Sequence, residues 1–589
     1  MAAPVLTLLT VLVMLLLLIR NTFEPVIIFM GGVVFLVTLG ILPMRDALVG
    51  FSNEGMLTVA VLFVIAGTLR RSPLVSAMDS RLFGDRAEGR RPMLRILAPI
   101  TLLSAFLNNT PIVAVFIPMI RRWAIQHNVS PSKYLIPLSY VSMFGGVLTL
   151  IGTSTNLVVS GMLQGLGHEP LGMFEITPIG LPLAGMGIAY LLFYAPRRLP
   201  DNQELLAFAK RSYREYLVTF QVTDDSRLAG KSIHQAGLRN LKGLYLFEIL
   251  RNRQRIYPVN PGEALQPADK LVFTGRLETI SQLQAMEGLK LLTSWEEDVT
   301  DALNGEARMV EAVVSGHFPF LNQTIKESRF RSHYNAAVVA VIRQGERINE
   351  KVGSIRLKPG DTLLLLAHPQ FANQWEGARD FYLISQRVQE RLLTPVQSSI
   401  ALAAFGLLIV TASIGLLSTL HASLLALCVL LFARVTPVKE ALRSIHWETL
   451  LVIAFSFGIG NALINTGAAS LVAGGLIRQM AFLGPIGVLA AVYLVTNLFT
   501  ALITNNAAAI LAFPIAYAAA IQLQLDPRPF AFAVAIAASA CFATPFGYQT
   551  NLMVYGPGGY TFRDFVRVGL PLNGLFFLGT MIILTLFYF

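Results

Sequence analysis

Asparagine and threonine residues interrupt two apolar stretches of the chain at matching places. The first interruption reads Leu107-Asn108-Asn109-Thr110 and the second reads Ile503-Thr504-Asn505-Asn506. A proline follows nine residues after Asn109 and nine residues after Asn505. An irregular backbone inside a bilayer is tolerated only where it is buried in protein or lines a cavity. These interruptions are therefore candidate binding sites.

A second pair of interruptions follows each of the first at nearly the same distance. Gly152-Thr153-Ser154-Thr155-Asn156-Leu157 matches Gly547-Tyr548-Gln549-Thr550-Asn551-Leu552, 47 residues separate Asn109 from Asn156, and 46 separate Asn505 from Asn551. Two polar interruptions in each of two related halves are typical of an inverted-repeat transporter with a site near the membrane midplane. Taken singly, Asn-Asn-Thr-Pro is more often a turn or a helix cap than a binding site, and Gly-Thr-Ser-Thr-Asn is equally often a polar kink that binds nothing.

The chemistry that these segments can perform is ion and anion binding. A break in a helix frees N–H groups, which hold an oxyanion, and C=O groups, which hold a hard cation such as sodium. The four segments contain no Asp, Glu, His, Lys or Arg. A proton relay normally needs an ionisable group in the membrane, so coupling to sodium is favoured, with at least two ions for two similar sites. Ser104 and Thr500, each five residues before the central asparagine, could line the same pocket or bond back to their own helix.

Composition places the chain in a membrane. Of its 589 residues, 54% are hydrophobic and 14% charged, and its mean hydropathy is +0.59. Apolar stretches run from residue 5 to 196 and from 398 to 588, and a charged segment separates them. Residues 4–19 read as a first span and not as a signal peptide. The net charge of +11 comes from arginines beside spans, so nucleic acid is not an expected partner, and the two cysteines have no metal-type spacing.

Charge also predicts the orientation. The loop at 70–95 holds seven arginines, which places it in the cytoplasm, and the chain is basic again after the first hairpin. That hairpin is therefore expected to be re-entrant, and the second half to be inverted relative to the first. We expect a multi-pass protein of the cell (inner) membrane with its inserted segment in the cytoplasm.

The inserted segment repeats at a period of 92 residues without a gap. Arg251 pairs with Arg343, and Pro267-Ala268-Asp269 pairs with Pro359-Gly360-Asp361. Each unit is predicted to form a small α/β module. No Gly-x-Gly-x-x-Gly follows a strand, so a dinucleotide-binding half is not expected.

At the paired interruptions the sequence resembles the divalent anion:sodium symporter family over both membrane halves. The resemblance implies a homodimer in which each protomer has scaffold and transport regions and moves as an elevator. It implies a first sodium ion at Ser104, Asn108, Asn109 and the Gly152 backbone, and a second at Thr500, Thr504, Asn505 and the Gly547 backbone. The implied substrate site comprises Asn109, Thr110, Ser154, Thr155, Asn505, Asn506 and Thr550. Asn108 and Asn506 stand where the family usually has Ser and Thr.

The inserted modules resemble the C-terminal domains of TrkA-type potassium-uptake regulators. Family members with such an insert resemble sulfate transporters of bacteria and algae, which favours sulfate over a dicarboxylate as substrate. The modules either sense a small regulatory ligand or mediate dimer contacts. A potassium channel or uptake subunit is a further alternative, although the filter-like Phe546-Gly547-Tyr548 occurs once and without the full signature. An enzyme is not expected, since no nucleophile with a base is apparent.

These patterns together predict a polytopic α-helical membrane protein with inverted repeats, two re-entrant hairpins and two broken helices. We expect two small α/β modules between the halves. The expected domains are the first transmembrane repeat (1–198), the first module (199–300), the second module (301–392) and the inverted second repeat (393–589).

Overall fold

The fold comes from a computed structural model of the whole chain. It describes residues 2–20, 23–72, 90–127, 129–201, 217–223, 226–238, 244–251, 254–256, 259, 262–275, 286, 288–292, 308–316, 318–343, 346–348, 350, 352–367, 371–375, 380–384 and 393–589. The expected module boundary at 300/301 and most of the arginine-rich loop lie outside these residues.

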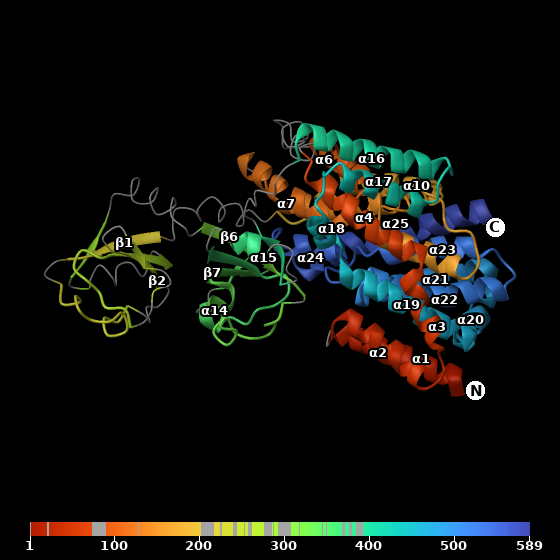
Figure 1. The fold of residues 1–589 in the computed structure, drawn as a ribbon, viewed down its shortest axis with the longest axis horizontal. Helices are drawn as coiled ribbons and strands as arrows, with labels where there is room; N and C mark the ends of the chain where they lie inside the picture. Colours follow the sequence, from red (N-terminus) through yellow and green to blue (C-terminus); the bar gives the residue numbers. More distant parts are fainter. Residues whose placement is uncertain are drawn as a thin grey trace.

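A body of packed helices carries the two modules at one end (Figure 1). Within the described residues, seven helices are long and apolar enough to cross a membrane: Ala3–Arg20, Met44–Leu69, Thr177–Arg197, Pro395–Ser413, Trp447–Asn465, Ala481–Leu502 and Phe562–Tyr588. This confirms the membrane class that composition predicts.

The helices fall into two sets in the same order. The first repeat comprises α1 (Ala2–Arg20), α2 (Pro25–Thr38), α3 (Met44–Leu48), α4 (Glu54–Arg70), α6 (Arg90–Ser104), α7 (Asn109–Gln126), α8 (Ser132–Gly146), α9 (Ser154–Gly165) and α10 (Thr177–Phe193). The second comprises α16 (Pro395–Ser413), α17 (Thr419–Phe432), α18 (Val438–Ser444), α19 (Trp447–Asn465), α20 (Ala468–Gln479), α21 (Gly484–Leu502), α22 (Asn505–Gln522), α23 (Pro527–Ser539), α24 (Gln549–Tyr555) and α25 (Phe562–Tyr588).

Both hairpins and both helix breaks fall where the sequence predicts them. The turn of the first hairpin lies between α6 and α7 and ends at Asn109, and that of the second lies between α21 and α22 and ends at Asn505. The breaks separate α8 from α9 and α23 from α24. The fold class is therefore confirmed.

One asparagine holds each break together. Asn156 Nδ2 donates to the carbonyls of Gly146 and Thr149 at 3.0 and 2.9 Å. Asn551 Nδ2 donates to the carbonyls of Cys541 and Thr544 at 2.8 and 3.0 Å. Each asparagine bonds to the carbonyls ten and seven residues before it. The two side chains therefore satisfy, in the same way, carbonyls that have no helical partner at the break.

The two modules have the same topology. The first is a five-stranded antiparallel sheet in the order β3-β2-β4-β1-β5, and the second has the order β10-β6-β9-β7-β8. The first contains β1 (Leu217–Val222), β2 (Leu244–Arg251), β3 (Gln254–Ile256), β4 (Lys270–Gly275) and β5 (Leu289–Leu291). The second contains β6 (Arg308–Val314), β7 (Ala336–Arg343), β8 (Glu346–Arg347), β9 (Thr362–Ala367) and β10 (Phe381–Ile384), with short helices α14 (Phe330–Tyr334) and α15 (Phe371–Trp375). Shifting β2 by 92 residues gives β7, so the period seen in the sequence is a structural repeat.

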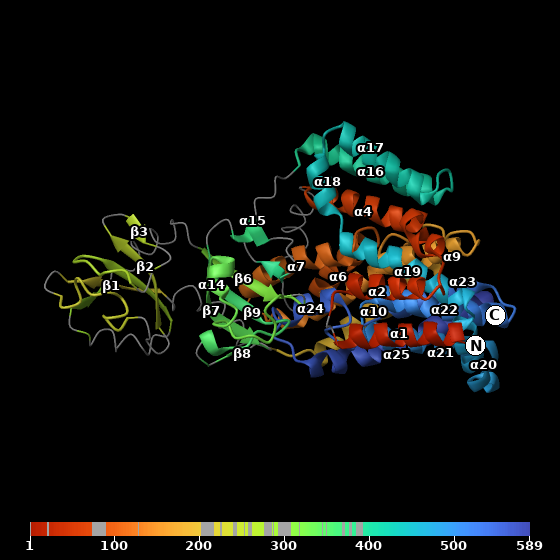
Figure 2. The ribbon, with the colours of Figure 1, turned by 60° about the horizontal axis from the view of Figure 1, so that its bottom comes forward.

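The same ion pair stabilises both modules. Arg251 Nε donates to Asp269 Oδ1 at 2.9 Å, and Arg343 Nε donates to Asp361 Oδ1 at 2.7 Å. Both aspartates are buried. Figures 1 and 2 both show the second module between the helical body and the first module.

Candidate functional site

The hairpin turns of each repeat contact the broken helix of the other repeat. Thr110 Oγ1 donates to Gln549 Oε1 at 3.2 Å, which joins α7 to α24. Ser154 Oγ donates to Asn506 Oδ1 at 2.9 Å, which joins α9 to α22. Thr110 corresponds to Asn506 in the repeat, and Ser154 corresponds to Gln549. The two crossed contacts are thus equivalent, and they bring the predicted substrate residues into one region.

The central asparagines take part in the same crossing. Asn109 Nδ2 donates to the hydroxyl of Tyr548 at 2.6 Å, and Asn505 Nδ2 donates to Thr155 Oγ1 at 3.1 Å. The Tyr548 hydroxyl also interacts with the side chains of Thr153 and Asn505. The ring is buried, so this one hydroxyl lies between the asparagines of the two hairpins.

Oxygen atoms gather at the first predicted sodium site. Ser104 Oγ lies 2.7 Å from Asn109 Oδ1 and 2.8 Å from the Ser142 carbonyl. A Cβ added to Gly152 would lie 2.8 Å from the Gly146 carbonyl oxygen, so the backbone of the break lies close beside them. Hydroxyl, amide and carbonyl oxygens form the neutral set that suits a hard monovalent cation. Ser104 and Asn109 are buried, and the oxygens around them fit a sodium ion.

The second predicted sodium site shares part of this construction. Thr500 Oγ1 donates to the Ala538 carbonyl at 2.8 Å and reaches forward by 38 residues, as Ser104 does. A Cβ on Gly547 would lie 2.3 Å from the Thr500 carbonyl oxygen, so only glycine fits there. Thr504 caps α22 without a side-chain cap bond and is exposed. The geometry therefore brings Thr500 and Gly547 together and leaves the Thr504 side chain outside that cluster.

Thr550 is held by the first repeat. Ser139 Oγ of α8 lies 2.8 Å from Thr550 Oγ1 and 2.7 Å from Asn551 Oδ1. All three side chains are buried. Thr550 thus lies at the start of α24 within the region where the hairpins and breaks meet.

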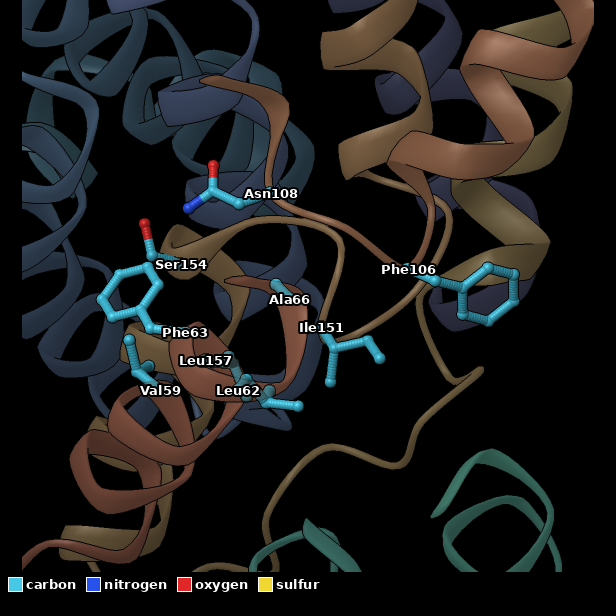
Figure 3. A pocket seen from close by; sticks show the side chains of 9 residues that line it. All are labelled: Val59, Leu62, Phe63, Ala66, Phe106, Asn108, Ile151, Ser154 and Leu157. Carbon is cyan, nitrogen blue, oxygen red and sulfur yellow. The ribbon is translucent and has the colours of Figure 1, made fainter. Parts of the chain in front are cut away.

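Asn108 lies on a cavity between α4 and the first hairpin. Figure 3 shows its amide beside the Ser154 hydroxyl, with Val59 and Phe63 of α4 nearby. The cavity has a volume of about 30 Å³, which is large enough for an ordered water molecule. Asn108 therefore borders the cavity that separates α4 from the first hairpin.

Three helices begin at this region: α7 at Asn109, α9 at Ser154 and α22 at Asn505. Their first N–H groups have no intrahelical acceptors, and their dipoles favour negative charge. The shorter α24 begins beside them at Gln549. A compact anion can therefore be held here without a basic side chain.

Comparison with known protein families identifies the family of this chain. The sequence profile of the citrate transporter family matches residues 13–537. The chain belongs to this family. It is therefore a membrane transporter, and the expected resemblance to divalent anion:sodium symporters is confirmed.

Several known proteins resemble this citrate transporter family member over nearly its whole length. A protein of Chlamydomonas reinhardtii named as a candidate sulfur deprivation response regulator is 36% identical over 97% of this chain and 99% of its own. An uncharacterized transporter of Synechocystis is 30% identical over 94% of this chain and 92% of its own. A Chlamydomonas reinhardtii protein named sodium/sulfate cotransporter 2 is 24% identical over 90% of this chain and 83% of its own.

One solved structure covers the whole of this citrate transporter family member. The crystal structure of the YdaH transporter of Alcanivorax borkumensis matches 100% of this chain and 98% of that chain, with 12% identity and a TM-score of 0.44.

Sequence reasoning missed Tyr548, Gln549, Ser139 and Ser142 as members of the site. Tyr548 and Gln549 stand at the positions of Thr153 and Ser154 in the first repeat, so a closer comparison of the two breaks could have found them. Ser139 and Ser142 lie on a continuous helix and give no local signal.

Proposed function

We propose that this protein is a sodium-coupled symporter of a small divalent oxyanion, foremost sulfate, that works by elevator-type alternating access. The crossed contacts between hairpin turns and broken helices carry this proposal, because they place oxygen clusters for cations beside helix N-termini for an anion. The two clusters, around Ser104 and around Thr500, would hold at least two sodium ions. Each bound ion would neutralise charge next to the anion.

Sulfate suits this site on chemical grounds. It is fully ionised and compact, and short hydroxyl and amide donors such as those of Thr110, Asn506 and Tyr548 can surround it. The relatives named sodium/sulfate cotransporters support this substrate. A dicarboxylate is the second candidate, favoured by the Asn109–Thr110 pair. The description of the family as citrate transporters supports a carboxylate substrate in general.

The expected setting of the transporter follows from charge. We place it in the cell (inner) membrane with both modules in the cytoplasm, as the loop arginines indicate. We further propose a homodimer, in which the helices around the site move against a scaffold that contains α4 and α19. The two modules remain candidates for TrkA-type domains that bind a small regulatory ligand.

Uptake of radiolabelled sulfate into proteoliposomes tests this function. We expect an inward sodium gradient to drive sulfate uptake that excess succinate does not inhibit. Sodium-driven uptake of succinate without sulfate uptake would assign the dicarboxylate function. A potassium flux without any anion uptake would contradict both.

A further inference from the structure

The second module contacts the helical body through a glycine turn. Residues 358–361 of this module lie against the end of α24. A Cβ added to Gly556 would lie 2.5 Å from the Gly360 carbonyl oxygen, and a Cβ added to Gly360 would lie 2.8 Å from the ring of Tyr555. Real Cβ atoms do not approach so closely, so both glycines are needed for this contact.

Two further contacts attach the second module to the helical body. Arg121 near the end of α7 forms an ion pair with Glu311 on β6. Val313, two residues further, is 1% exposed and belongs to the apolar core of the helical body. Because α7 begins at Asn109 and α24 begins next to Thr550, the module is attached to the two helices that carry the site.

The first module lacks this docking surface. The counterparts of Glu311, Val313, Gly360 and Thr362 at the 92-residue period are Thr219, Gln221, Ala268 and Lys270. Ala268 has a positive φ of 63°, in the same region as the 83° of Gly360, and is exposed. The turn itself therefore accepts alanine, and glycine is needed at 360 because of the Tyr555 ring.

The repeat partner of Gly556 shows where this glycine would lie in the opposite conformation. Gly161 of α9 occupies the equivalent position and packs on the scaffold. A Cβ added to Gly161 would lie 2.6 Å from Asn53 Oδ1 and 3.3 Å from the Phe457 ring, and Asn53 Nδ2 donates to the Gly161 carbonyl at 3.1 Å.

Inverted repeats rock against each other between two access states, and the symmetry of the repeats predicts that the two halves then exchange their contacts. The counterpart of α4 is α19, since both follow a short helix that begins after a proline, Pro43 or Pro437. In that register Phe63 is the counterpart of Phe457. The exchanged state thus places Gly556 against the start of α19 and against Phe63, on the face that residues 358–361 now cover.

We propose that this turn of the second module is a brake on transport: it must leave Gly556 before the protein can reach the opposite access state. The inference rests on the proposed alternating-access function and adds its regulation. The module is released as a unit, since its own sheet and ion pair stay intact when the turn leaves α24. A ligand or partner that binds the undocked module better would speed transport.

The variants that test the docking contact replace residues of the second module by their counterparts in the first module. We would compare Val313→Gln and Gly360→Ala with the matched changes Gln221→Val and Ala268→Gly. The reporter is Met162→Cys in a Cys428→Ser background, because Met162 is 4% exposed and lies against Gly460 of α19. We expect the docking variants to raise the rate of maleimide labelling at least threefold, and the matched changes to leave it unaltered. Equal rates in all variants would overturn the brake.

A reversible crosslink provides the opposite test. Arg121→Cys and Glu311→Cys, joined by a cleavable bifunctional thiol reagent, should abolish sodium-driven uptake, and cleavage should restore it. Undiminished uptake by the crosslinked protein would overturn the brake. If no variant and no wild-type sample takes up any anion, the proposed function fails, and the labelling of Met162→Cys still decides whether docking restrains the helices.

Discussion

The side-chain amide of Asn109 donates a hydrogen bond of 2.6 Å to the hydroxyl of Tyr548. This bond joins the first hairpin to the second helix break. Tyr548 occupies the position that the much smaller Thr153 occupies in the first break. The two halves therefore contribute different side chains to the site. A hydroxyl that accepts from an amide still has its own proton, which it can donate to a neighbouring oxygen or to an anion.

Replacing Tyr548 by phenylalanine tests this hydroxyl. We expect Tyr548→Phe to raise the KM for the transported anion by about tenfold, because one hydrogen bond contributes roughly 0.5–1.5 kcal/mol and more when the partner is charged. The control is Tyr190→Phe, whose hydroxyl donates to the Val568 carbonyl at a distance from the site. A KM that is equal in both variants would remove Tyr548 from the binding site.

The two central asparagines should be equally necessary. We expect Asn109→Ala and Asn505→Ala each to abolish sodium-dependent uptake, since each removes one donor from the crossing, and Asn109→Ala also removes an amide oxygen from the cluster around Ser104. Gel filtration should show that both variants remain folded, with the elution volume of the wild type. Unchanged uptake in either variant would contradict the site assignment for that repeat.

Gly161 should control the balance between access states. A Cβ at this position meets Asn53 Oδ1 at 2.6 Å, whereas a Cβ at Gly165 reaches the Phe457 ring only at 3.7 Å, an ordinary contact. Gly161→Ala should therefore destabilise this conformation by about 1–3 kcal/mol. Transport should be slower because the protein returns to this conformation less readily, whereas Gly165→Ala should be neutral. Transport rates measured at saturating substrate distinguish the two, and equal rates would show that the α4–α9 contact does not limit turnover.

The Arg343–Asp361 ion pair should contribute strongly to the stability of the second module. Burial raises the pKa of Asp361, and the hydrogen bond to Arg343 opposes that shift. Arg343→Ala leaves a buried carboxyl without its cation, so we expect a loss of about 3 kcal/mol in the free energy of unfolding. Limited proteolysis should cleave the second module of this variant first, whereas Arg251→Ala should expose the first module instead. Resistance equal to that of the wild type would contradict this role.

Internal repetition explains why so much of the fold was predictable. Two matched interruptions per half, with prolines at equal spacing, located both hairpins and both breaks to within a few residues. The 92-residue period aligned each strand of one module with a strand of the other. Each of these patterns involves residues close together in the sequence, and each occurs twice in the chain, so one copy supports the interpretation of the other.

The crossed contacts were not predictable in the same way. Thr110 meets Gln549 across 439 residues, and Ser154 meets Asn506 across 352, so only the packing of the two repeats brings them together. Tyr548 differs in type from its repeat partner Thr153, so only a direct comparison of the two breaks would have marked it. The family resemblance placed Asn108 and Thr504 with the ions, whereas their side chains border a cavity and the surface, because a hairpin turn points successive residues in different directions.

The exchange of partners between hairpins and breaks means that neither half can form a site alone. Each of the four hydrogen bonds Thr110–Gln549, Ser154–Asn506, Asn109–Tyr548 and Asn505–Thr155 requires one residue from each half. Two separate copies of one half could reproduce these contacts only as an antiparallel pair, inserted into the membrane in both directions. The chain combines such a dual-topology pair in one polypeptide, and the insert between its halves links two segments that cross the membrane in opposite senses.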